Sequence, residues 1–199
     1  MVFSEALIMP GLLREGQIPK ASQMPQKKLY LYSFSSPIRK EVLEEGDDYF
    51  PETICSRNDP SMRPLVSSLR RELEKTFDLN LFTTYFSEIT SYPGTQVGSR
   101  GAVPTREYSL IVNLGGNVPE PLTVFLSPFI KQGEREYVLG LGDGLLFKGL
   151  ESAHKIKPVR SLYETEGTTG LFDDDSHQRF LVCNFVNADG YFVHYAYSG

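Results

Sequence analysis

At 199 residues and 22.4 kDa, with 40% hydrophobic and 23% charged residues, the chain has the size and composition of one folded domain, which excludes disorder over most of its length. A net charge of -5 argues against broad contact with nucleic-acid phosphates, and no apolar run reaches the roughly 18 residues that a membrane-spanning helix needs. Glu5 stands where a signal peptide carries positive charge, and two cysteines cannot build a disulfide framework, so we expect a cytoplasmic protein.

The first 59 residues are expected to form an irregular N-terminal segment. Pro, Gly, Gln and Lys are mixed there without a sustained period, and residues 28–34 (KLYLYSF) alternate as a strand does. The edge of such a strand would allow a homodimer by pairing with a second copy of the chain. The acidic stretch that follows, residues 43–52, is expected to be a solvated loop.

A helix is predicted over residues 60–78. Asp59, Pro60 and Ser61 form a capping sequence at its start. An apolar residue then recurs at every fourth position, at Leu65, Leu69, Leu73 and Phe77. This spacing gives the helix one apolar stripe, which we expect to cover a face of a sheet.

From residue 79 onward the pattern changes to short strands separated by turn residues. Strands are predicted at residues 81–92, 108–115, 122–129, 135–141, 144–149, 154–159, 178–186 and 190–197. No helical pattern separates them, which argues against a doubly wound α/β fold. We therefore expect residues 1–199 to form a single, mostly β domain whose core, residues 79–199, is a sandwich or barrel.

Four segments of this core resemble the 2-oxoglutarate/Fe(II) dioxygenase superfamily. They read YPGTQVGSRGA (92–102), REYSLIVNLGG (106–116), LGLGDGLLFKGLESAH (139–154) and QRFLVCNFVNADG (178–190). The resemblance covers residue 79 to the C-terminus and implies a double-stranded β-helix, a jelly-roll or cupin-like fold with flanking helix. In that family a His-x-Asp pair and a distal His bind Fe(II), and a basic residue near the last core strand binds the 2-oxoglutarate carboxylate.

The iron ligands that the resemblance implies are incomplete in this chain. His154 stands at the position of the distal His, and no His precedes it. The segment aligned with the first two ligands reads GSRGA (98–102), with Arg100 in place of the His and Ala102 in place of the Asp. An arginine has no lone pair to offer a metal, so a normal triad cannot form and no cofactor is expected.

A pocket can persist without iron, with the Arg100 guanidinium in place of the metal charge. Because a guanidinium binds carboxylates and phosphates through two hydrogen bonds, we expect a small anionic or polar ligand and, where catalysis occurs, a non-oxidative reaction. The candidate catalytic residues are Arg100, His154 and Glu107, and the candidate ligand-binding residues are Arg179, Arg160 and Tyr108.

Two alternatives remain open. The first is an active Fe(II)- and 2-oxoglutarate-dependent oxygenase with unusual metal ligands, such as Glu107 together with His154. The second is a non-catalytic interaction module whose barrel is filled by its own aromatic side chains. Of the other motifs, GLGDG (140–144) is expected to be a turn between strands, and Cys183, in the middle of a strand, an inert core thiol.

Overall fold

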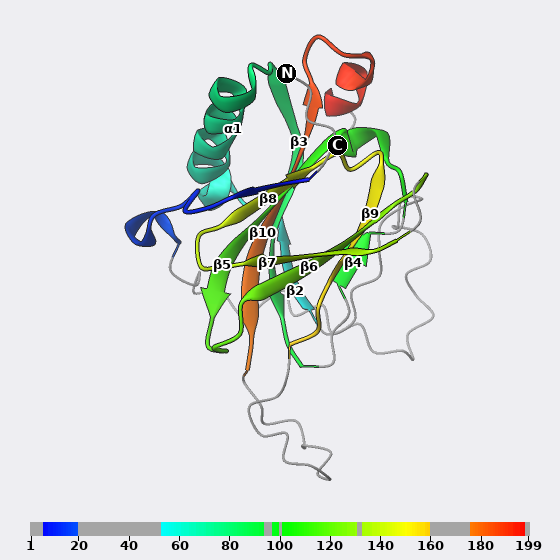
Figure 1. Ribbon diagram of the computed structural model, residues 1–199. Helices are drawn as coiled ribbons and strands as arrows, with labels where there is room; N and C mark the ends of the chain where they lie inside the picture. Colours follow the sequence, from blue (N-terminus) through cyan, green and yellow to red (C-terminus); the bar gives the residue numbers. More distant parts are fainter. Residues whose placement is uncertain are drawn as a thin grey trace, which may run out of the picture.

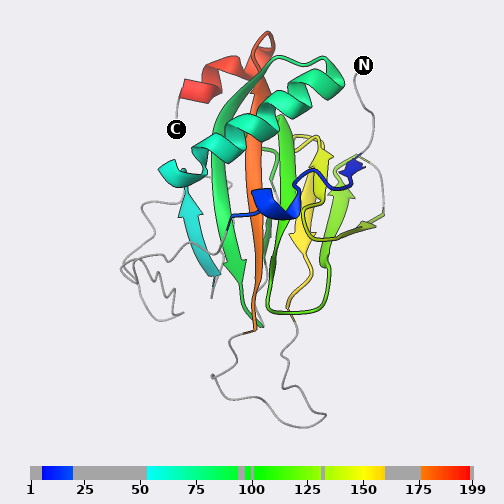
Figure 2. The same ribbon diagram turned by 90° about the vertical axis from the view of Figure 1, so that its left-hand side faces the viewer.

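The computed structural model describes residues 6–19, 53–93, 97–99, 101–130, 133–159 and 176–197. Two antiparallel sheets face one another, and a helix crosses the outer face of the larger sheet (Figures 1 and 2). The predicted mostly β fold is confirmed. Within the described ranges, no helix is long and apolar enough to span a membrane.

The larger sheet has six strands and the smaller has four. The order in the larger sheet is β1 (Leu7–Met9), β8 (Gly144–Phe147), β5 (Tyr108–Gly116), β10 (Gln178–Asn187), β3 (Leu81–Ser91) and β2 (Thr53–Arg57). The order in the smaller sheet is β4 (Val97–Ser99), β9 (Ser152–Ile156), β6 (Leu122–Pro128) and β7 (Arg135–Leu139). The sequence predicts seven of these strands and misses the short β1, β2 and β4.

Alternating side chains divide the core into two layers. One layer lies between the sheets, where Phe180 and Val182 of β10 meet apolar residues of the smaller sheet such as Val124. The other layer lies between the larger sheet and the helix, and it contains Leu181 and Cys183 of the same strand. Burial raises the pKa of the Cys183 thiol, which keeps it protonated, as expected for a core residue.

Helix α1 (Arg63–Phe77) confirms the predicted helix, although the first turn is tighter than expected. Residues Pro60–Met62 form a 3₁₀ turn, η3, which Asp59 caps by accepting a hydrogen bond from the backbone N–H of Ser61 at 2.9 Å. The helix buries Val66, Leu69 and Leu73 against the sheet. Figure 2 shows α1 lying diagonally across β3, β10 and β5.

The last predicted strand, residues 190–197, is wrong. Residues Tyr191–Tyr197 form a 3₁₀ helix, η5, after a turn in which the N–H of Gly190 donates to the carbonyl of Asn187. A 3₁₀ helix brings residues three apart onto one face, and the rings of Tyr191 and His194 make such a contact with centroids 5.7 Å apart. Aromatic residues at every third position satisfy this period, although the same letters also alternate like a strand.

The N-terminal part contains more structure than the sequence indicates. β1 pairs with β8, and η1 (Glu15–Gln17) follows it. The N–H of Leu13 donates to the carbonyl of Gly142 at 2.9 Å, in the turn that the motif at 140–144 predicts. Gly142 has a φ of +79°, which favours glycine at this position. The predicted strand at 28–34 and acidic loop at 43–52 lie outside the described residues.

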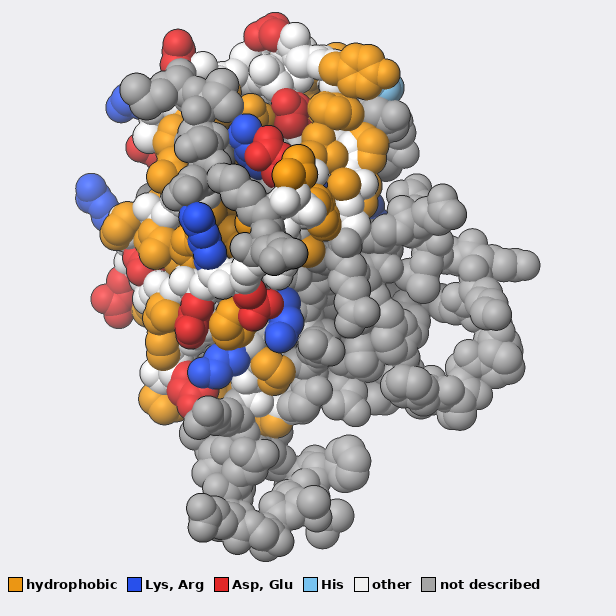
Figure 3. Space-filling view, turned by 45° about the vertical axis from the view of Figure 1, so that its right-hand side comes forward, with side chains coloured by type: hydrophobic (Ala, Val, Ile, Leu, Met, Phe, Trp, Pro, Cys, Tyr) orange, Lys and Arg blue, Asp and Glu red, His pale blue; other side chains and the backbone are white. Residues whose placement is uncertain are grey.

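Charged side chains of both signs are interspersed on one face of the molecule (Figure 3). On the face shown in Figure 3, Lys and Arg side chains lie close to Asp and Glu side chains, with apolar side chains between them. On the outer side of the smaller sheet, the ammonium group of Lys155 lies 5.3 Å from the ring centroid of Phe125. This outward position of Lys155 leaves its neighbour His154 facing the larger sheet.

Candidate functional site

His154 lies on β9 with its side chain between the two sheets. It shares this face of the strand with Ile156, which belongs to the core between the sheets. Its ring packs edge-on against Phe147 of the larger sheet, with centroids 5.6 Å apart. β9 pairs His154 with Ser99 of β4 on one side and Leu126 of β6 on the other.

A row of side chains, polar except for Phe147, crosses the larger sheet opposite His154. Phe147, Ser109, Asn184 and Tyr85 are direct partners on the neighbouring strands β8, β5, β10 and β3. The hydroxyl of Ser109 donates to the amide oxygen of Asn184 at 2.7 Å, and both side chains are buried. Because the interior beyond this row is apolar, the row marks one polar end of the barrel.

Two arginines surround Tyr85 at this polar end. Arg106 ends the short helix η4 (Pro104–Arg106), is 8% exposed, and donates from Nε to the hydroxyl of Tyr85. The guanidinium carbon of Arg57, at the end of β2, lies 4.6 Å from the ring centroid of Tyr85. Two contacts hold η4 in place: the hydroxyl of Thr84 on β3 donates to the carbonyl of Thr105 at 2.7 Å, and the turn after β8 packs against Arg106.

The turn after β8 needs glycine to approach η4 so closely. A side chain at Gly149 would collide with the carbonyl oxygen of Arg106 and with the hydroxyl of Ser109. The contact therefore joins the strand that carries Phe147 to the helix that carries Arg106.

His154 is neutral at physiological pH. Burial of the imidazole, and then the positive charge of Arg106, lower its pKa from 6.5 to about 3. No described carboxylate acts on this pKa in the opposite direction. A neutral imidazole has one N–H to donate and one nitrogen to accept a hydrogen bond, so His154 offers a ligand both functions without a charge.

The neutral state of His154 predicts a pH-dependent stability. Below pH 6.5 the unfolded chain takes up a proton at this residue, whereas the folded protein does so only near pH 3, so acid favours unfolding. Between pH 6 and 5 we expect the free energy of unfolding to fall in both proteins. The fall is expected to be larger in the native protein than in His154→Gln, by about 1 kcal/mol. Urea unfolding of both proteins at pH 8, 6 and 5 measures the difference. Equal slopes would mean that His154 titrates normally in the folded state.

Arg179 lies on the opposite face of the larger sheet from His154. Its Nε and Nη2 donate to Oε1 of Glu88 at 3.0 and 2.5 Å, and both terminal nitrogens lie 3.2 Å from the carbonyl oxygen of Pro19. Because Phe180 and Val182 point between the sheets, the alternation of β10 turns Arg179 toward the helix side. The structure therefore does not bring Arg179 to the polar end of the barrel.

The remaining candidate residues from the sequence lie in different places. Glu107 accepts a hydrogen bond from the backbone N–H of Asn187 at 2.8 Å, and the contacts of the described residues do not join it to His154. Tyr108 is buried in the core on the helix side, where burial and then the charges of Glu107 and Glu151 raise its pKa. Arg100 and Arg160 lie outside the described residues, although Arg100 follows directly after Ser99, the partner of His154.

The residues present do not fit the iron centre that the fold family implies. A facial triad needs two imidazoles and a carboxylate around one point, and His154 is joined instead by a buried arginine. Among the described residues no three His, Cys, Asp or Glu side chains gather in a way that could hold a metal ion. Ala102, which the resemblance aligns with the carboxylate, has no side-chain atom that could bind a metal.

Four residues of this end were not predicted from the sequence: Tyr85, Arg106, Ser109 and Asn184. A signal for Ser109 and Asn184 was present, because each is a polar residue next to apolar residues in a predominantly apolar strand. Such residues are commonly functional when they are buried and hydrogen-bonded to each other. No comparable signal distinguished Arg106 from the other arginines, since its burial depends on the fold.

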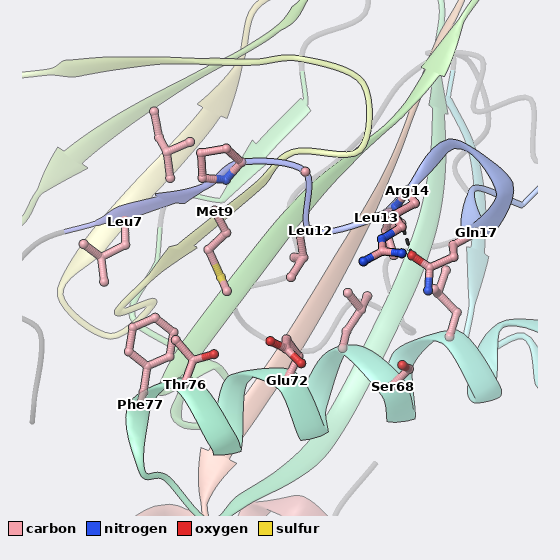
Figure 4. A pocket seen from close by; sticks show the side chains of 15 residues that line it. Leu7, Met9, Leu12, Leu13, Arg14, Gln17, Ser68, Glu72, Thr76 and Phe77 are labelled. Carbon is pink, nitrogen blue, oxygen red and sulfur yellow. Dashed lines mark hydrogen bonds between the residues drawn. The ribbon is translucent and has the colours of Figure 1, made fainter.

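One cavity adjoins the row of side chains opposite His154, and a larger groove lies elsewhere. Phe147 forms part of a cavity of about 190 Å³ together with Leu126, Tyr137 and Lys148. A groove of about 700 Å³ runs between residues 7–17 and α1. Figure 4 shows Leu7, Met9, Leu12 and Phe77 on its walls, with Glu72, Ser68 and Thr76 along the helix and Arg14 and Gln17 at one end.

The fold has clear relatives among solved structures, although no family model and no curated protein matches the sequence. SnoN, a non-heme alpha-ketoglutarate-dependent epimerase from nogalamycin biosynthesis, is 12% identical with a TM-score of 0.57, over 92% of this chain and 76% of its own. The structure of SnoN in complex with Fe³⁺, alpha-ketoglutarate and nogalamycin RO is 12% identical with a TM-score of 0.54, and the match covers 92% of this chain and 79% of that one. A Pseudomonas putida prolyl-4-hydroxylase is 13% identical with a TM-score of 0.47, and the match covers 68% of this chain and 72% of that one. The resemblance seen in the sequence is thus confirmed at the level of the fold: the chain is a double-stranded β-helix of the kind found in 2-oxoglutarate/Fe(II) dioxygenases.

Proposed function

We propose that this protein is a dioxygenase-like β-helix with a degenerate metal site, and that the polar end of its barrel binds a small anionic molecule without iron. The observation that carries the proposal is the buried, positively charged Arg106, which lies close enough to His154 to lower its pKa. In a metal centre the second and third groups would be a metal-binding imidazole and a carboxylate. An arginine at this position attracts an anion and repels a cation.

The surrounding side chains suit the recognition of an anion. Arg57 adds a second guanidinium on the ring of Tyr85, and the Ser109–Asn184 pair adds neutral polar groups facing the same space. A guanidinium forms strong, directional hydrogen bonds with carboxylates and phosphates. Arg100, one residue beyond Ser99 in the sequence, is expected to contribute a further positive charge.

Binding is favoured over acid-base catalysis by His154. A general base works best when its pKa lies near the operating pH, and a pKa of about 3 makes this imidazole a weak base at neutral pH. We therefore expect His154 to donate or accept a hydrogen bond to the ligand. A non-oxidative reaction of the bound molecule would need another group to move the proton.

We expect that the protein shows no response to Fe(II) and 2-oxoglutarate. Titration of the full chain with both under anaerobic conditions is expected to give no new absorption band, no rise in the unfolding temperature and no succinate on admission of oxygen. Inorganic phosphate or citrate at constant ionic strength is expected to raise the unfolding temperature, because a ligand that binds only the folded state stabilises it.

The matched variants are His154→Gln and Glu107→Gln, which remove the ligands that an unusual iron centre would use. Neither substitution is expected to change the response to iron. Stoichiometric Fe(II) in the native protein that is lost in His154→Gln, together with succinate formation, would overturn the proposal in favour of an oxygenase.

A second candidate, a non-catalytic interaction module, is favoured by one observation. The space between the sheets is filled by buried apolar side chains, of which Phe147 and Phe180 are the largest. If neither phosphate nor citrate changes the unfolding temperature and iron also has no effect, this candidate replaces the first.

A further inference from the structure

We propose that the cavity of about 190 Å³ beside Phe147 holds an apolar ring of about the size of a phenyl group, so that the ligand of this protein is an anion that carries such a ring. The inference rests on the proposed function, which assigns the anionic end of the ligand to the polar end of the barrel. It adds the place where the rest of the ligand lies and the shape that the protein selects.

The cavity lies beside the residues that contact His154. Phe147, whose ring packs edge-on against His154, forms one wall. Leu126, the β-sheet partner of His154 on β6, forms another. Phe147 is also the partner of Ser109 in the row that crosses the larger sheet. A molecule that reaches His154 with its polar end therefore has the cavity next to it.

The walls of the cavity suit an apolar group. Phe147 and Leu126 belong to the core between the sheets, and Tyr137 of β7 packs against the same core. Ala6, directly before β1, also packs there and contributes a methyl group. Because β1 and β7 are the edge strands of the two sheets, the cavity lies where these edges come together. An apolar group bound there is removed from water on both sides.

The charged side chains of the lining already have partners. Lys148 and Glu151 form an ion pair, with 2.8 Å between Nζ and Oε1. Arg135, the other charged residue of the lining, also has an interaction partner. The cavity therefore requires no charge from the ligand, and an uncharged part of the molecule is favoured there.

The volume of the cavity indicates which group fits. In another protein, a cavity of about 150 Å³ lined by Leu, Ile and Phe stays dry and binds benzene. The cavity beside Phe147 is of similar size, so it accommodates one six-membered ring, whereas the methyl group of acetate would leave most of it empty. The rings of Phe147 and Tyr137 also offer edge-on or offset contacts to an aromatic ring.

The experiment measures the affinity of the full chain for small anions by calorimetry at pH 7.5 and constant ionic strength. The probes are phosphate, acetate and three carboxylates whose phenyl ring is attached directly or through one or two methylene groups: benzoate, phenylacetate and 3-phenylpropionate. The best of these three is expected to bind at least about tenfold more tightly than acetate, because its ring leaves water. Benzene, which has no charge, is expected to raise the unfolding temperature, which tests the cavity without the anion.

Two substitutions fill the cavity from different elements. Ala6→Leu adds a larger apolar side chain directly before β1, and Ser152→Leu adds one at the start of β9. Each is expected to weaken binding of the best ring carboxylate by about tenfold or more and to leave acetate binding within about twofold. The unfolding temperature without ligand shows whether each variant folds, and where one does not fold, the other decides the proposal.

Ala153→Leu is the matched control. Ala153 lies between Ser152 and His154, so strand alternation places its side chain on the outer face of the smaller sheet. The substitution adds the same atoms as Ala6→Leu without entering the cavity. It is expected to leave the affinity for every probe within about twofold of the native value.

The outcomes that would overturn the proposal differ from one another. If acetate and phosphate bind but no ring carboxylate binds more tightly than acetate, the assignment of the cavity is wrong and the proposed function stands. The same holds if the tighter binding persists unchanged in both Ala6→Leu and Ser152→Leu. If benzene raises the unfolding temperature but no anion binds, the anion-binding function is wrong, and with it the anionic ligand. If neither benzene nor any anion has an effect, the cavity assignment and the proposed function are both wrong.

Discussion

Replacement of Arg179 by Met is expected to lower the free energy of unfolding by about 3–5 kcal/mol. The side chains of Arg179 and Glu88 are 9% and 4% exposed, and two guanidinium nitrogens donate to one carboxylate oxygen. Without Arg179, the carboxylate of Glu88 would be a buried charge without its partner, and the carbonyl of Pro19 would lose its donors. Equilibrium unfolding in urea measures the loss.

Two further variants separate the charge from the packing of this ion pair. Arg179→Lys keeps the charge but loses the planar fork, so a smaller loss is expected. The double variant E88Q/R179M removes both charges and is expected to be more stable than Arg179→Met alone. A loss below about 1 kcal/mol for Arg179→Met would show instead that the pair is solvated, as surface ion pairs are.

Replacement of Phe180 by Ala is the second substitution with a large expected effect, a loss of about 3–5 kcal/mol. Phe180 is fully buried between the sheets and is paired with Ile89 and Asn113 on the neighbouring strands. Removing the ring takes away its own burial and leaves a cavity that the surrounding β-sheets cannot fill by moving. Urea unfolding at pH 7.5 gives the magnitude.

The matched control is Ile130→Ala at the end of the β6 hairpin, where the side chain is 95% exposed. It is expected to change the free energy of unfolding by no more than about 0.5 kcal/mol. A comparably small effect of Phe180→Ala would contradict a barrel that is filled by its own side chains, and with it the basis of the interaction-module candidate.

The fold could be predicted largely from alternation and turn residues. β5 and β10 are nearly continuous apolar runs bounded by Gly, Asn or Gln, and both lie in the middle of the larger sheet. β4 has only three residues and a glycine, so no pattern could develop within it. The aromatic residues of 190–197 fit both the two-residue period of a strand and the three-residue period of a 3₁₀ helix. In the structure this segment follows a turn and packs as a 3₁₀ helix against β3, β10 and η4.

The site was only partly predictable, because a strand pattern does not state which face is inside. His154 became a candidate through the family resemblance, and the structure pairs it with Ser99 of β4. Arg179 was expected to bind a ligand because it begins β10. Neighbouring residues of a strand point to opposite faces of the sheet. Arg179 therefore points to the helix side, where it contacts Glu88, and Phe180 points into the space between the sheets. Tyr85 and Arg106 became candidates only once their contact was known.

The polar end of the barrel is assembled from segments that are widely separated along the chain. The hydrogen bond between Ser109 and Asn184 spans 75 positions, and Arg57, Tyr85, Arg106 and His154 come from four other elements. These groups are therefore brought together only in the folded domain, in which β10 lies in the middle of the larger sheet. A ligand bound at this end would contact segments from the N-terminal and the C-terminal parts of the chain at once. Its binding would therefore slow the global unfolding of the domain as well as the motion of the loops around the site.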